Sequence, residues 1–337
     1  MPGGAAPTGT DPATRAAALA EAALAGDRRA LARLLTAVEN RTPVAEHALR
    51  RLYPAAGQAH LVGITGPPGA GKSTLVAALI GLVRSAGRTV AVIAVDPSSP
   101  ITGGALLGDR VRMQAYAGDD GVFIRSMAAR GHAGGLAAST GAAAAVLDAA
   151  GFDLVLVETV GTGQSEVEVA AAADTTVVLE APEMGDEVQA IKAGLLEVAD
   201  LVVVNKGDRP GALRTASQLR AMLSAAAPPD PGDGRPRPKR PDVLVTTAST
   251  GEGVEDLLAA LDRHRLTARD AGGPARMARA EQQVWAIVVE RLRDRLRAPG
   301  RWPATEATLA AVARHELDPY AAADALLASL DETEDRR

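Results

Sequence analysis

The 337-residue sequence contains no cysteine, which excludes disulfide bonds, thiolate metal sites and cysteine nucleophiles together. It also lacks any stretch of about 20 consecutive apolar residues, so no membrane-spanning helix is predicted. Positive charge is not in excess: the formal net charge is −5 at pH 7, which leaves no global basic footprint for nucleic acid. Residues 1–7 lack the charged start and apolar core of a secretory signal and are expected to form a disordered tail. These absences favour a cytoplasmic protein that binds neither a membrane nor nucleic acid.

What the sequence does contain is a phosphate-binding loop. Residues 66–73 read GPPGAGKS, the Walker A pattern G-x-x-x-x-G-K-[ST], between a strand-like apolar segment (61–65) and a helical one (74–85). Glycines let the backbone curl so that N–H groups point at phosphate oxygens, and the helix N-terminus adds partial positive charge. Lys72 is expected to reach the β- and γ-phosphates, and the Ser73 hydroxyl to ligate Mg²⁺. The predicted phosphate-binding residues are Gly66, Pro68, Gly69, Ala70, Gly71, Lys72, Ser73 and Thr74. The chain is therefore predicted to bind a nucleoside triphosphate.

A second loop predicts which base is bound. Residues 201–204 form a fully apolar run, as expected of a strand buried on both faces of a parallel sheet. The run ends in the sequence NKGD (205–208), the N-K-x-D form of guanine-specifying loops. The Asp208 carboxylate can accept the N1–H and a 2-amino hydrogen of guanine, a pair that adenine does not offer. Lys206 is expected to lay its stem along the base, and Asn205 to tie this loop to the phosphate loop.

The guanine prediction has a second element. The strand-like residues 243–245 lead into Thr246, Thr247, Ala248 and Ser249. The Ala248 N–H is placed to meet guanine O6, so Thr247, Ala248 and Ser249 join the predicted base site. The sequence thus predicts GTP and GDP as ligands, with ATP as the alternative.

Carboxylates follow two further buried strands. Residues 89–95 end in Asp96, and residues 153–157 end in the sequence ETVG (158–161). Because the carboxyl ends of strands line the ligand crevice of an open α/β sheet, Asp96 and Glu158 are expected beside a Mg²⁺ that bridges phosphates. The ETVG sequence stands in the place of the usual D-x-x-G, and the Gly161 N–H is expected to sense the γ-phosphate.

Residues 101–113, between those strands, are rich in glycine and other small residues and form a candidate switch. Asp109 is a candidate to complete the metal shell, and Arg110 or Arg112 to act on phosphate charge. A charged helix start is the alternative interpretation of these three residues.

Longer strings of residues resemble a known family, the MeaB/ArgK-type G3E GTPases. The strings DPSSP (96–100), TGG (102–104), LGDR (107–110) and RM (112–113) look like the first switch of these proteins. The string ETVGTGQSE (158–166) resembles their second switch. Their third switch is matched by Gly185, Asp186, Glu187, Gln189, Ile191 and Lys192. The resemblance extends from about residue 18 to about residue 330.

The resemblance implies a P-loop GTPase of the α/β class, with a mostly parallel sheet flanked by helices and helical extensions at both ends. Members are GTP-dependent chaperones of adenosylcobalamin-dependent acyl-CoA mutases, methylmalonyl-CoA mutase above all, and gate cofactor loading and protect the mutase. The family implies that Ser73, Asp96, Asp109 and Glu158 surround Mg²⁺, and that Asp186 and Lys192 couple the nucleotide to the mutase. The predicted catalytic set is Lys72, Asp96, Arg112, Glu158, Gly161 and Lys192.

Two positions depart from the family pattern. The sequence APEM (181–184) replaces a smaller Pro-Gly-Ala-type run before the third switch and can alter its mobility. Gly207 stands where alanine is usual, and this change is expected to be harmless because that side chain makes no specific contact.

The domain organisation follows from these motifs. We expect a disordered tail (1–14), an N-terminal helical extension (15–58), a G-domain (59–266) and a C-terminal helical segment (274–331). The family resemblance implies a homodimer formed through the C-terminal segment, and packing on the chain's own core is the alternative. A proline-rich loop with a basic end (227–240) is expected to be solvated.

Two other functions are alternatives to the mutase chaperone. A GTP-dependent metallochaperone of the nickel-enzyme type needs clusters of cysteine and histidine, and the five histidines here are scattered. A transport-linked kinase needs an acceptor site with a general base, and the sequence does not place one. GTP hydrolysis is predicted to be slow without a partner, because Thr162 follows Gly161 where Ras-like enzymes place a water-orienting glutamine. Gln164 is the weaker candidate for that task, and a partner that orders the switches can accelerate GTPases roughly 10³–10⁵-fold.

Overall fold

The computed structural model describes residues 11–97, 114–116, 118–129, 135–159, 173–182, 196, 198–225, 241–270 and 273–331. Contacts divide the chain into two units, Met1–Arg279 and Ala280–Arg337. None of the helices in the described residues combines the length and apolar character needed to cross a bilayer.

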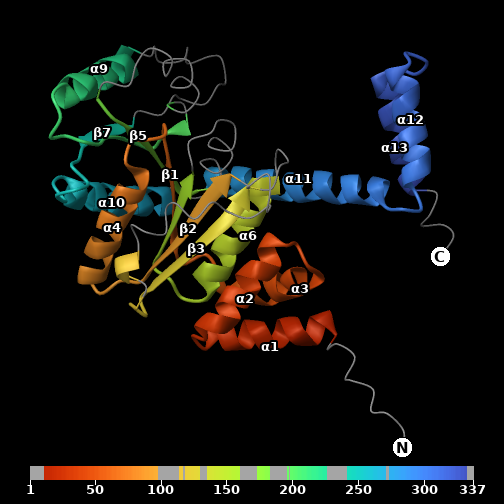
Figure 1. Ribbon diagram of the computed structural model, residues 1–337, viewed down its shortest axis with the longest axis horizontal. Coiled ribbons are helices and arrows are strands. Elements are labelled where there is room, and N and C mark those ends of the chain that lie inside the picture. Colours follow the sequence, from red (N-terminus) through yellow and green to blue (C-terminus); the bar gives the residue numbers. More distant parts are fainter. Residues whose placement is uncertain are drawn as a thin grey trace, which may run out of the picture. The chain divides into compact units, whose positions relative to one another are not determined.

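A seven-stranded sheet forms the centre of the first unit (Figure 1). Its strands are β1 (His60–Thr65), β2 (Val90–Pro97), β3 (Val122–Ala129), β4 (Leu154–Thr159), β5 (Thr175–Glu180), β6 (Leu201–Val204) and β7 (Asp242–Val245). They lie in the order β3-β2-β4-β1-β5-β6-β7, and every neighbouring pair is parallel. The predicted α/β fold with a parallel sheet is confirmed.

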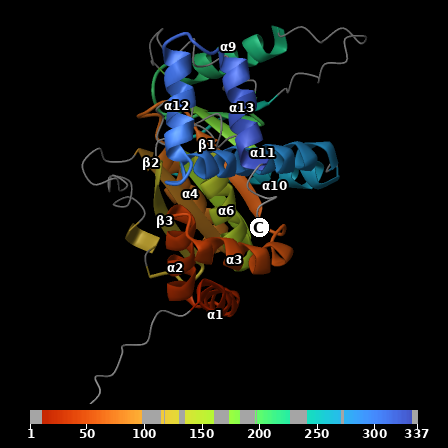
Figure 2. The same cartoon turned by 90° about the vertical axis from the view of Figure 1, so that its right-hand side faces the viewer.

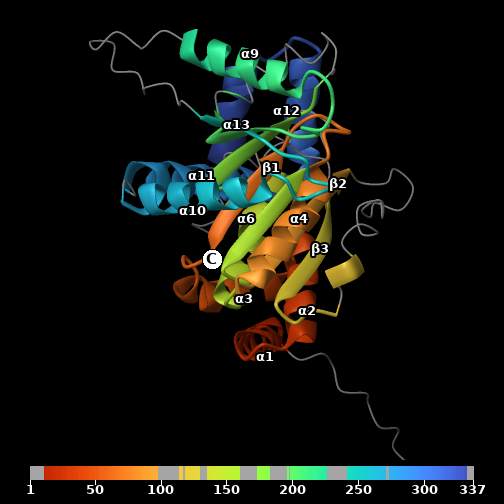
Figure 3. The same cartoon turned by 90° about the vertical axis from the view of Figure 1, so that its left-hand side faces the viewer.

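Helices cover both faces of this sheet, because its strands are apolar on both sides. Their bounds are α4 (Lys72–Ser85), α6 (Gly135–Ala149), α9 (Ala212–Ala225) and α10 (Val254–Asp270). Alternate residues of β2 and β4 enter one core with α4 and α10 and another with α6 and the N-terminal helices. Figure 3 views the molecule from the side of α4 and α10. Helix α9 packs on β6 and β7 and forms a third core with them. Because all neighbouring strands are parallel, their carboxyl ends lie along the same edge of the sheet.

Aspartates fasten the amino-terminal ends of the strands. The Asp153 carboxylate, before β4, accepts the Thr89 N–H at 2.8 Å, and Asp174, before β5, accepts the Leu61 N–H at 3.1 Å. Asp200, before β6, accepts the Thr176 N–H at 2.8 Å. Burial alone raises the pKa of Asp153, but its hydrogen bonds from Thr89 outweigh burial and lower that pKa overall. Backbone amides at or next to the start of β1, β2 and β5 therefore gain carboxylate partners.

The N-terminal helices α1 (Pro12–Leu24), α2 (Arg28–Glu39) and α3 (Pro43–Leu52) pack on α6. Helix α2 starts at an N-cap, Asp27, whose side chain accepts the N–H groups of residues 29 and 30. It continues with buried leucines and a valine at helical spacing, namely Leu31, Leu34, Leu35 and Val38.

Helix α2 also covers the outer edge of strand β3. The Arg28 guanidinium donates to the carbonyls of Asp120 (2.8 Å) and Val122 (2.5 Å). At the other end of α2, the Glu39 carboxylate accepts the Ala128 N–H and pairs with Arg125 at 2.6 Å. An edge strand presents unpaired backbone groups that invite aggregation, and here side chains of a helix occupy them.

The second unit contains the distal part of α11 (Gly273–Arg297) together with α12 (Trp302–Ala313) and α13 (Pro319–Asp331). Figure 2 shows α12 and α13 lying side by side. The Arg301 guanidinium donates to the Ser329 carbonyl at 3.0 Å, and the buried Thr305 hydroxyl donates to the Leu296 carbonyl at 3.0 Å. These bonds join the ends of the three helices within the unit.

Candidate functional site

The phosphate loop (residues 66–73) connects the central strand β1 to helix α4. Gly66 and Gly71 have φ angles of 139° and 96°, in the left-handed region that favours glycine. A Cβ at Gly66 would lie 2.3 Å from the Leu179 carbonyl oxygen, and one at Gly71 would lie 2.4 Å from Asn205 Nδ2. Both glycines are therefore required by close approach as well as by conformation.

Lys72, the first residue of α4, is folded over this loop. Its ammonium donates to the carbonyls of Gly66 (2.7 Å) and Pro67 (3.1 Å), and the residue is only 7% exposed. A buried ammonium is thus held directly above the loop that is predicted to hold phosphate. Phosphate oxygens carry more negative charge than carbonyls, so bound nucleotide would compete for this cation.

Ser73 and Glu158 are brought together by neighbouring strands. The Ser73 hydroxyl donates to Glu158 Oε1 at 2.5 Å, and both residues are buried. Glu158 is paired in register with Ile64 of β1 and Ala94 of β2, so it stands between the phosphate loop and the end of β2. A hydroxyl and a carboxylate in contact are the hard oxygen donors that Mg²⁺ requires, so the residues present fit that ion.

Two further metal ligands were predicted, Asp96 and Asp109, and the structure describes only the backbone of Asp96. Asp96 lies in β2 opposite Ala128 of β3, but its side chain is not among the described ones. Asp109 lies outside the described residues. In the part of the chain that is described, no three histidine or acidic side chains gather into a metal-binding group.

Several predicted residues also fall outside the described ranges. They are Arg110, Arg112, Gly161, Thr162, Gln164, Asp186 and Lys192. Their predicted parts in catalysis and switching stay predictions.

Asn205 joins the phosphate loop to both loops of the predicted base site. Its amide donates to the Ala70 carbonyl at 2.9 Å, so the predicted tie between the two loops is confirmed. Its Oδ1 accepts the Thr246 hydroxyl and the Ala248 N–H, each at 3.1 Å. The Ala248 amide, predicted to meet guanine O6, thus already has a protein acceptor, with which guanine O6 would have to share it.

The guanine loop (residues 205–208) is a tight turn held by its backbone. Lys206 has φ of 58°, and its carbonyl accepts the Arg209 N–H at 2.9 Å. The Gly207 N–H donates to the Thr246 carbonyl at 2.9 Å. The turn leaves the Asp208 side chain exposed, as a base-binding carboxylate must be. Of the neighbouring loop, Thr247 is buried, with its N–H bound to the Glu252 carbonyl at 2.9 Å, and Ser249 is exposed.

Gly207 lies in a crowded part of the guanine loop. A Cβ there would lie 2.9 Å from Val245 Cγ1, 3.1 Å from Thr247 Oγ1 and 3.2 Å from the Thr246 carbonyl oxygen. An alanine would have to displace at least one of these atoms. The end of β7 thus fills the space that an alanine methyl group would need, and that glycine is harmless at this position stays a prediction.

Sequence reasoning missed one buried acid, Glu180. It is 2% exposed, ends strand β5 and lies between the two predicted loops. Its carbonyl accepts the Asn205 N–H at 2.8 Å. The signal was available, since a carboxylate that ends an apolar strand is the pattern that singled out Asp96 and Glu158.

Comparisons with known proteins show what the whole chain is similar to. The family described as methylmalonyl-CoA mutase-associated GTPase MeaB matches residues 31–300. A Pyrococcus abyssi protein, named as a GTPase, is 46% identical over 304 residues, which are 90% of this chain and 93% of that protein. The mouse mitochondrial methylmalonic aciduria type A homolog is 36% identical over 228 residues, 66% of this chain and 53% of its own length. The crystal structure of a LAO/AO transport system kinase is similar with a TM-score of 0.68 and 29% identity, over 96% of this chain and 100% of that one.

Proposed function

This chain belongs to the MeaB family of methylmalonyl-CoA mutase-associated GTPases and is a GTPase; we propose that it serves an adenosylcobalamin-dependent acyl-CoA mutase as a chaperone. In this role it gates the loading of the mutase's cofactor and protects or reactivates the enzyme. The family description and the mouse relative, named for methylmalonic aciduria, support a mutase as the client. We place this activity in the cytoplasm.

The observation that carries the proposal is the bond between Ser73 and Glu158. Ser73 belongs to the phosphate loop, and Glu158 is the first residue of the segment that is proposed to sense the γ-phosphate. One buried hydrogen bond therefore links nucleotide binding to the start of a switch. A ligand that alters this contact can shift the position of the chain that follows Glu158, which is how a nucleotide would be reported to a client.

The groups of this chain would divide the work of hydrolysis. Lys72 leaves the Gly66 and Pro67 carbonyls for the phosphates, and the N–H groups of the phosphate loop stabilise the charge that develops on the transferring phosphoryl group. Water attacks the γ-phosphorus, the bond to the β-phosphate oxygen breaks, and GDP and phosphate are released. We assign Mg²⁺ to Ser73 and Glu158, together with Asp96 and Asp109. When bound, Mg²⁺ neutralises part of the charge on the β- and γ-phosphates.

The base site is proposed on Asn205, Lys206 and Asp208, with Thr247, Ala248 and Ser249 beside them. Asn205 joins this site to the phosphate loop through Ala70, so base recognition and phosphate binding share one rigid connection. This supports GTP over ATP, because the exposed Asp208 carboxylate suits the two N–H donors of guanine.

We also propose that the second unit forms a homodimer with another copy of this chain. Large apolar side chains are exposed on all three of its helices, including Trp285 (59%), Leu309 (48%) and Leu327 (50%). Exposed apolar groups gathered in one unit mark an interaction surface. We expect light scattering to give a molar mass of two chains for the wild-type protein and of one chain for Trp285→Glu. Leu213→Glu, at an exposed leucine of α9, is the matched control and should leave the dimer intact. A monomeric wild-type protein would contradict this proposal.

The chaperone proposal is tested by affinity capture from the host lysate, with the protein held by GDP or by a non-hydrolysable GTP analogue. We expect an adenosylcobalamin-dependent acyl-CoA mutase to be recovered in amounts that differ between the two nucleotides. An exposed control such as Asp242→Asn should capture the same client. Recovery of a transporter component or of a nickel enzyme, with no mutase although one is expressed, would overturn the proposal.

A further inference from the structure

Two threonine hydroxyls meet where strands β1 and β4 end. Thr65 is the last residue of β1 and Thr159 is the last residue of β4, and each is 1% exposed. The Thr159 hydroxyl donates to the Thr65 hydroxyl oxygen at 3.1 Å, and the Ile64 carbonyl oxygen lies 3.5 Å from it. The function proposed above makes no use of this threonine pair, Thr65 and Thr159.

The strand register explains why the two side chains meet. The ladder between β1 and β4 is parallel and places Ile64 opposite Glu158. Thr65 and Thr159 are the next residues of the two strands. Because side chains alternate between the two faces of a sheet, both threonines point to the face opposite that of Ile64 and Glu158. The hydroxyl bond therefore continues the connection between the two strands by one residue.

The end of β4 is thus bound on both faces of the sheet. On the face that α4 covers, Glu158 accepts the Ser73 hydroxyl at 2.5 Å. On the face that α6 covers, Thr159 is bound to Thr65. Thr65 directly precedes the phosphate loop, and Ser73 is its last residue. Two consecutive residues of β4 are therefore attached to the two ends of that loop.

Thr65 is itself held from the other side of β1. It is paired in register with Val178 of β5. The next residue, Gly66, packs so closely on β5 that a Cβ there would lie 2.3 Å from the Leu179 carbonyl oxygen. A bond from Thr159 to Thr65 therefore restrains the end of β4 relative to the phosphate loop.

We propose that Thr65 and Thr159 are positioning residues for Mg²⁺, because they hold the Glu158 carboxylate against Ser73. The inference rests on the proposed function, which assigns Mg²⁺ to Ser73 and Glu158. A cation that takes both oxygens as ligands competes with the bond between them, but it leaves the threonine bond on the other face intact. The threonine pair therefore keeps Glu158 in place while the cation binds.

The test is Thr159→Val, which removes the hydroxyl and keeps a β-branched side chain of similar shape. The measured quantity is the Mg²⁺ coupling, which is the ratio of the GDP dissociation constants without and with saturating Mg²⁺. We expect the variant to reduce the Mg²⁺ coupling roughly threefold to tenfold, the effect of losing one neutral hydrogen bond. GDP affinity without Mg²⁺ should stay at the wild-type value, because the variant removes no group that is proposed to bind the nucleotide.

A double variant, Thr65→Val with Thr159→Val, separates positioning from stability. A single replacement deprives one buried hydroxyl of this partner and should lower the Tm, whereas replacing both threonines should restore the Tm. The Mg²⁺ coupling of the double variant should nevertheless stay as low as that of Thr159→Val, because both lack the same bond.

Thr159→Ser gives the opposite combination. It keeps the hydroxyl and should keep the wild-type Mg²⁺ coupling, although the loss of a buried methyl group should lower its Tm. If the threonine pair were merely structural, the Mg²⁺ coupling would follow the Tm in all of these variants.

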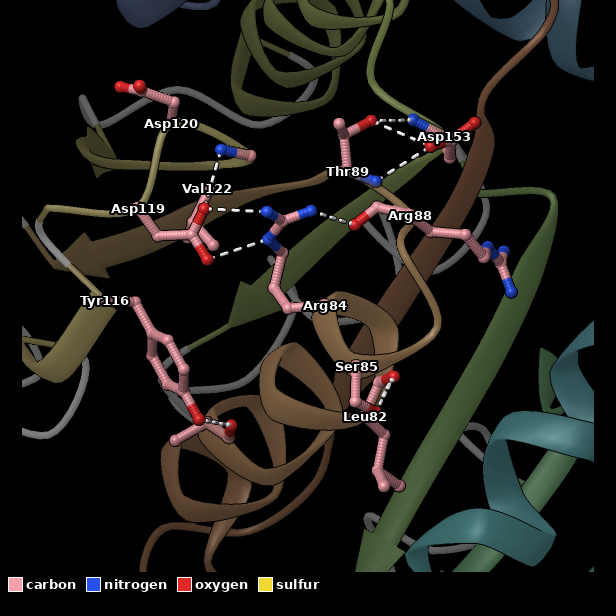
Figure 4. Close-up of polar contacts among 12 residues, drawn as sticks. Leu82, Arg84, Ser85, Arg88, Thr89, Tyr116, Asp119, Asp120, Val122 and Asp153 are labelled. Carbon is pink, nitrogen blue, oxygen red and sulfur yellow. Dashed lines mark hydrogen bonds and ion pairs between the residues drawn. The ribbon is translucent and has the colours of Figure 1, made fainter.

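Thr89→Val is the matched control, since it is the same substitution at the other end of β4 (Figure 4). The Thr89 hydroxyl donates to the Asp153 carboxylate at 2.9 Å and accepts the Asp153 N–H at 2.9 Å, so it joins the starts of β2 and β4. Because the strands are parallel, this pair lies at the edge of the sheet opposite the phosphate loop. Its loss should lower the Tm and leave the Mg²⁺ coupling unchanged.

Glu158→Gln distinguishes failure of this inference from failure of the proposed Mg²⁺ site. It should reduce the Mg²⁺ coupling more than Thr159→Val does, because it removes the charge of a proposed ligand. If Glu158→Gln reduces the coupling and Thr159→Val does not, the threonine pair does not position Glu158 and the inference is wrong. If neither variant changes the coupling, the assignment of Mg²⁺ to Glu158 is wrong and the inference fails with it. Failure to capture a mutase would overturn only the chaperone proposal.

Discussion

Asp208→Asn is expected to change the preferred nucleotide from GTP to XTP. The aspartate offers two acceptors to the N1–H and 2-amino group of guanine, whereas asparagine offers one acceptor and one donor. Xanthine has a carbonyl where guanine has its 2-amino group, so it matches the asparagine. In the variant one hydrogen bond to guanine is replaced by a donor that faces the 2-amino group, and the other loses its charged acceptor, which should weaken GTP binding roughly 10²–10⁴-fold. XTP should then bind the variant more tightly than it binds the wild-type protein.

This substitution should leave the fold intact. The turn is held by backbone bonds of Lys206 and Gly207, and the Asp208 side chain is exposed. The measurement is a titration of wild type and variant with fluorescent GDP and XDP, with unfolding temperatures recorded alongside. Asp242→Asn, at an exposed aspartate that begins β7, is the control and should bind GDP normally. A variant that still binds GDP like wild type would rule out Asp208 as the base-reading group.

The features predicted correctly from the sequence are those that a short contiguous segment determines. The phosphate loop is one: its glycines, Lys72 and Ser73 lie within eight residues, and their conformation follows from local backbone sterics. The parallel sheet is another, because apolar runs such as 201–204 must be buried on both faces. The Asn205 contact with Ala70 was predictable because both loops follow strands that end at the same edge of the sheet.

The features that were missed depend on residues far apart in the chain. The crowding around Gly207 was not predicted because its neighbours, Val245 and Thr247, come about 40 residues later. The covering of the β3 edge by Arg28 and Glu39 joins segments about 90 residues apart, and no local pattern marks those two side chains. The Tyr116 hydroxyl donates to the Ala77 carbonyl of α4, and Gly81 leaves the room for it. From the sequence alone, a glycine in a helix indicates only a local loss of helix stability. Each of these contacts depends on tertiary packing between distant residues. The hydrophobic periodicity of the sequence does not show which residues pack together.

The second large effect is expected at Lys72. Lys72→Ala should reduce single-turnover GTP hydrolysis by roughly 10²–10³-fold or more, the loss found when one preorganised donor to a developing charge is removed. The structure gives a second reason for this loss of rate, in addition to the charge of Lys72. The ammonium is buried and already bound to two carbonyls of the phosphate loop, so it is positioned before phosphate arrives. Single-turnover hydrolysis with excess protein separates this effect from nucleotide release.

Lys206→Ala is the informative comparison, because Lys206 is the lysine of the guanine loop. Its side chain is proposed to contact the base, which does not change during the reaction. Removing it should therefore raise KM and leave kcat close to the wild-type value, whereas Lys72→Ala should lower kcat even at saturating GTP. If Lys72→Ala hydrolysed GTP at the normal rate, the phosphate loop would not be the site of the reaction. If both variants instead lost only affinity, Lys72 would stabilise bound GTP and the transition state equally, and its charge would not lower the barrier of the chemical step.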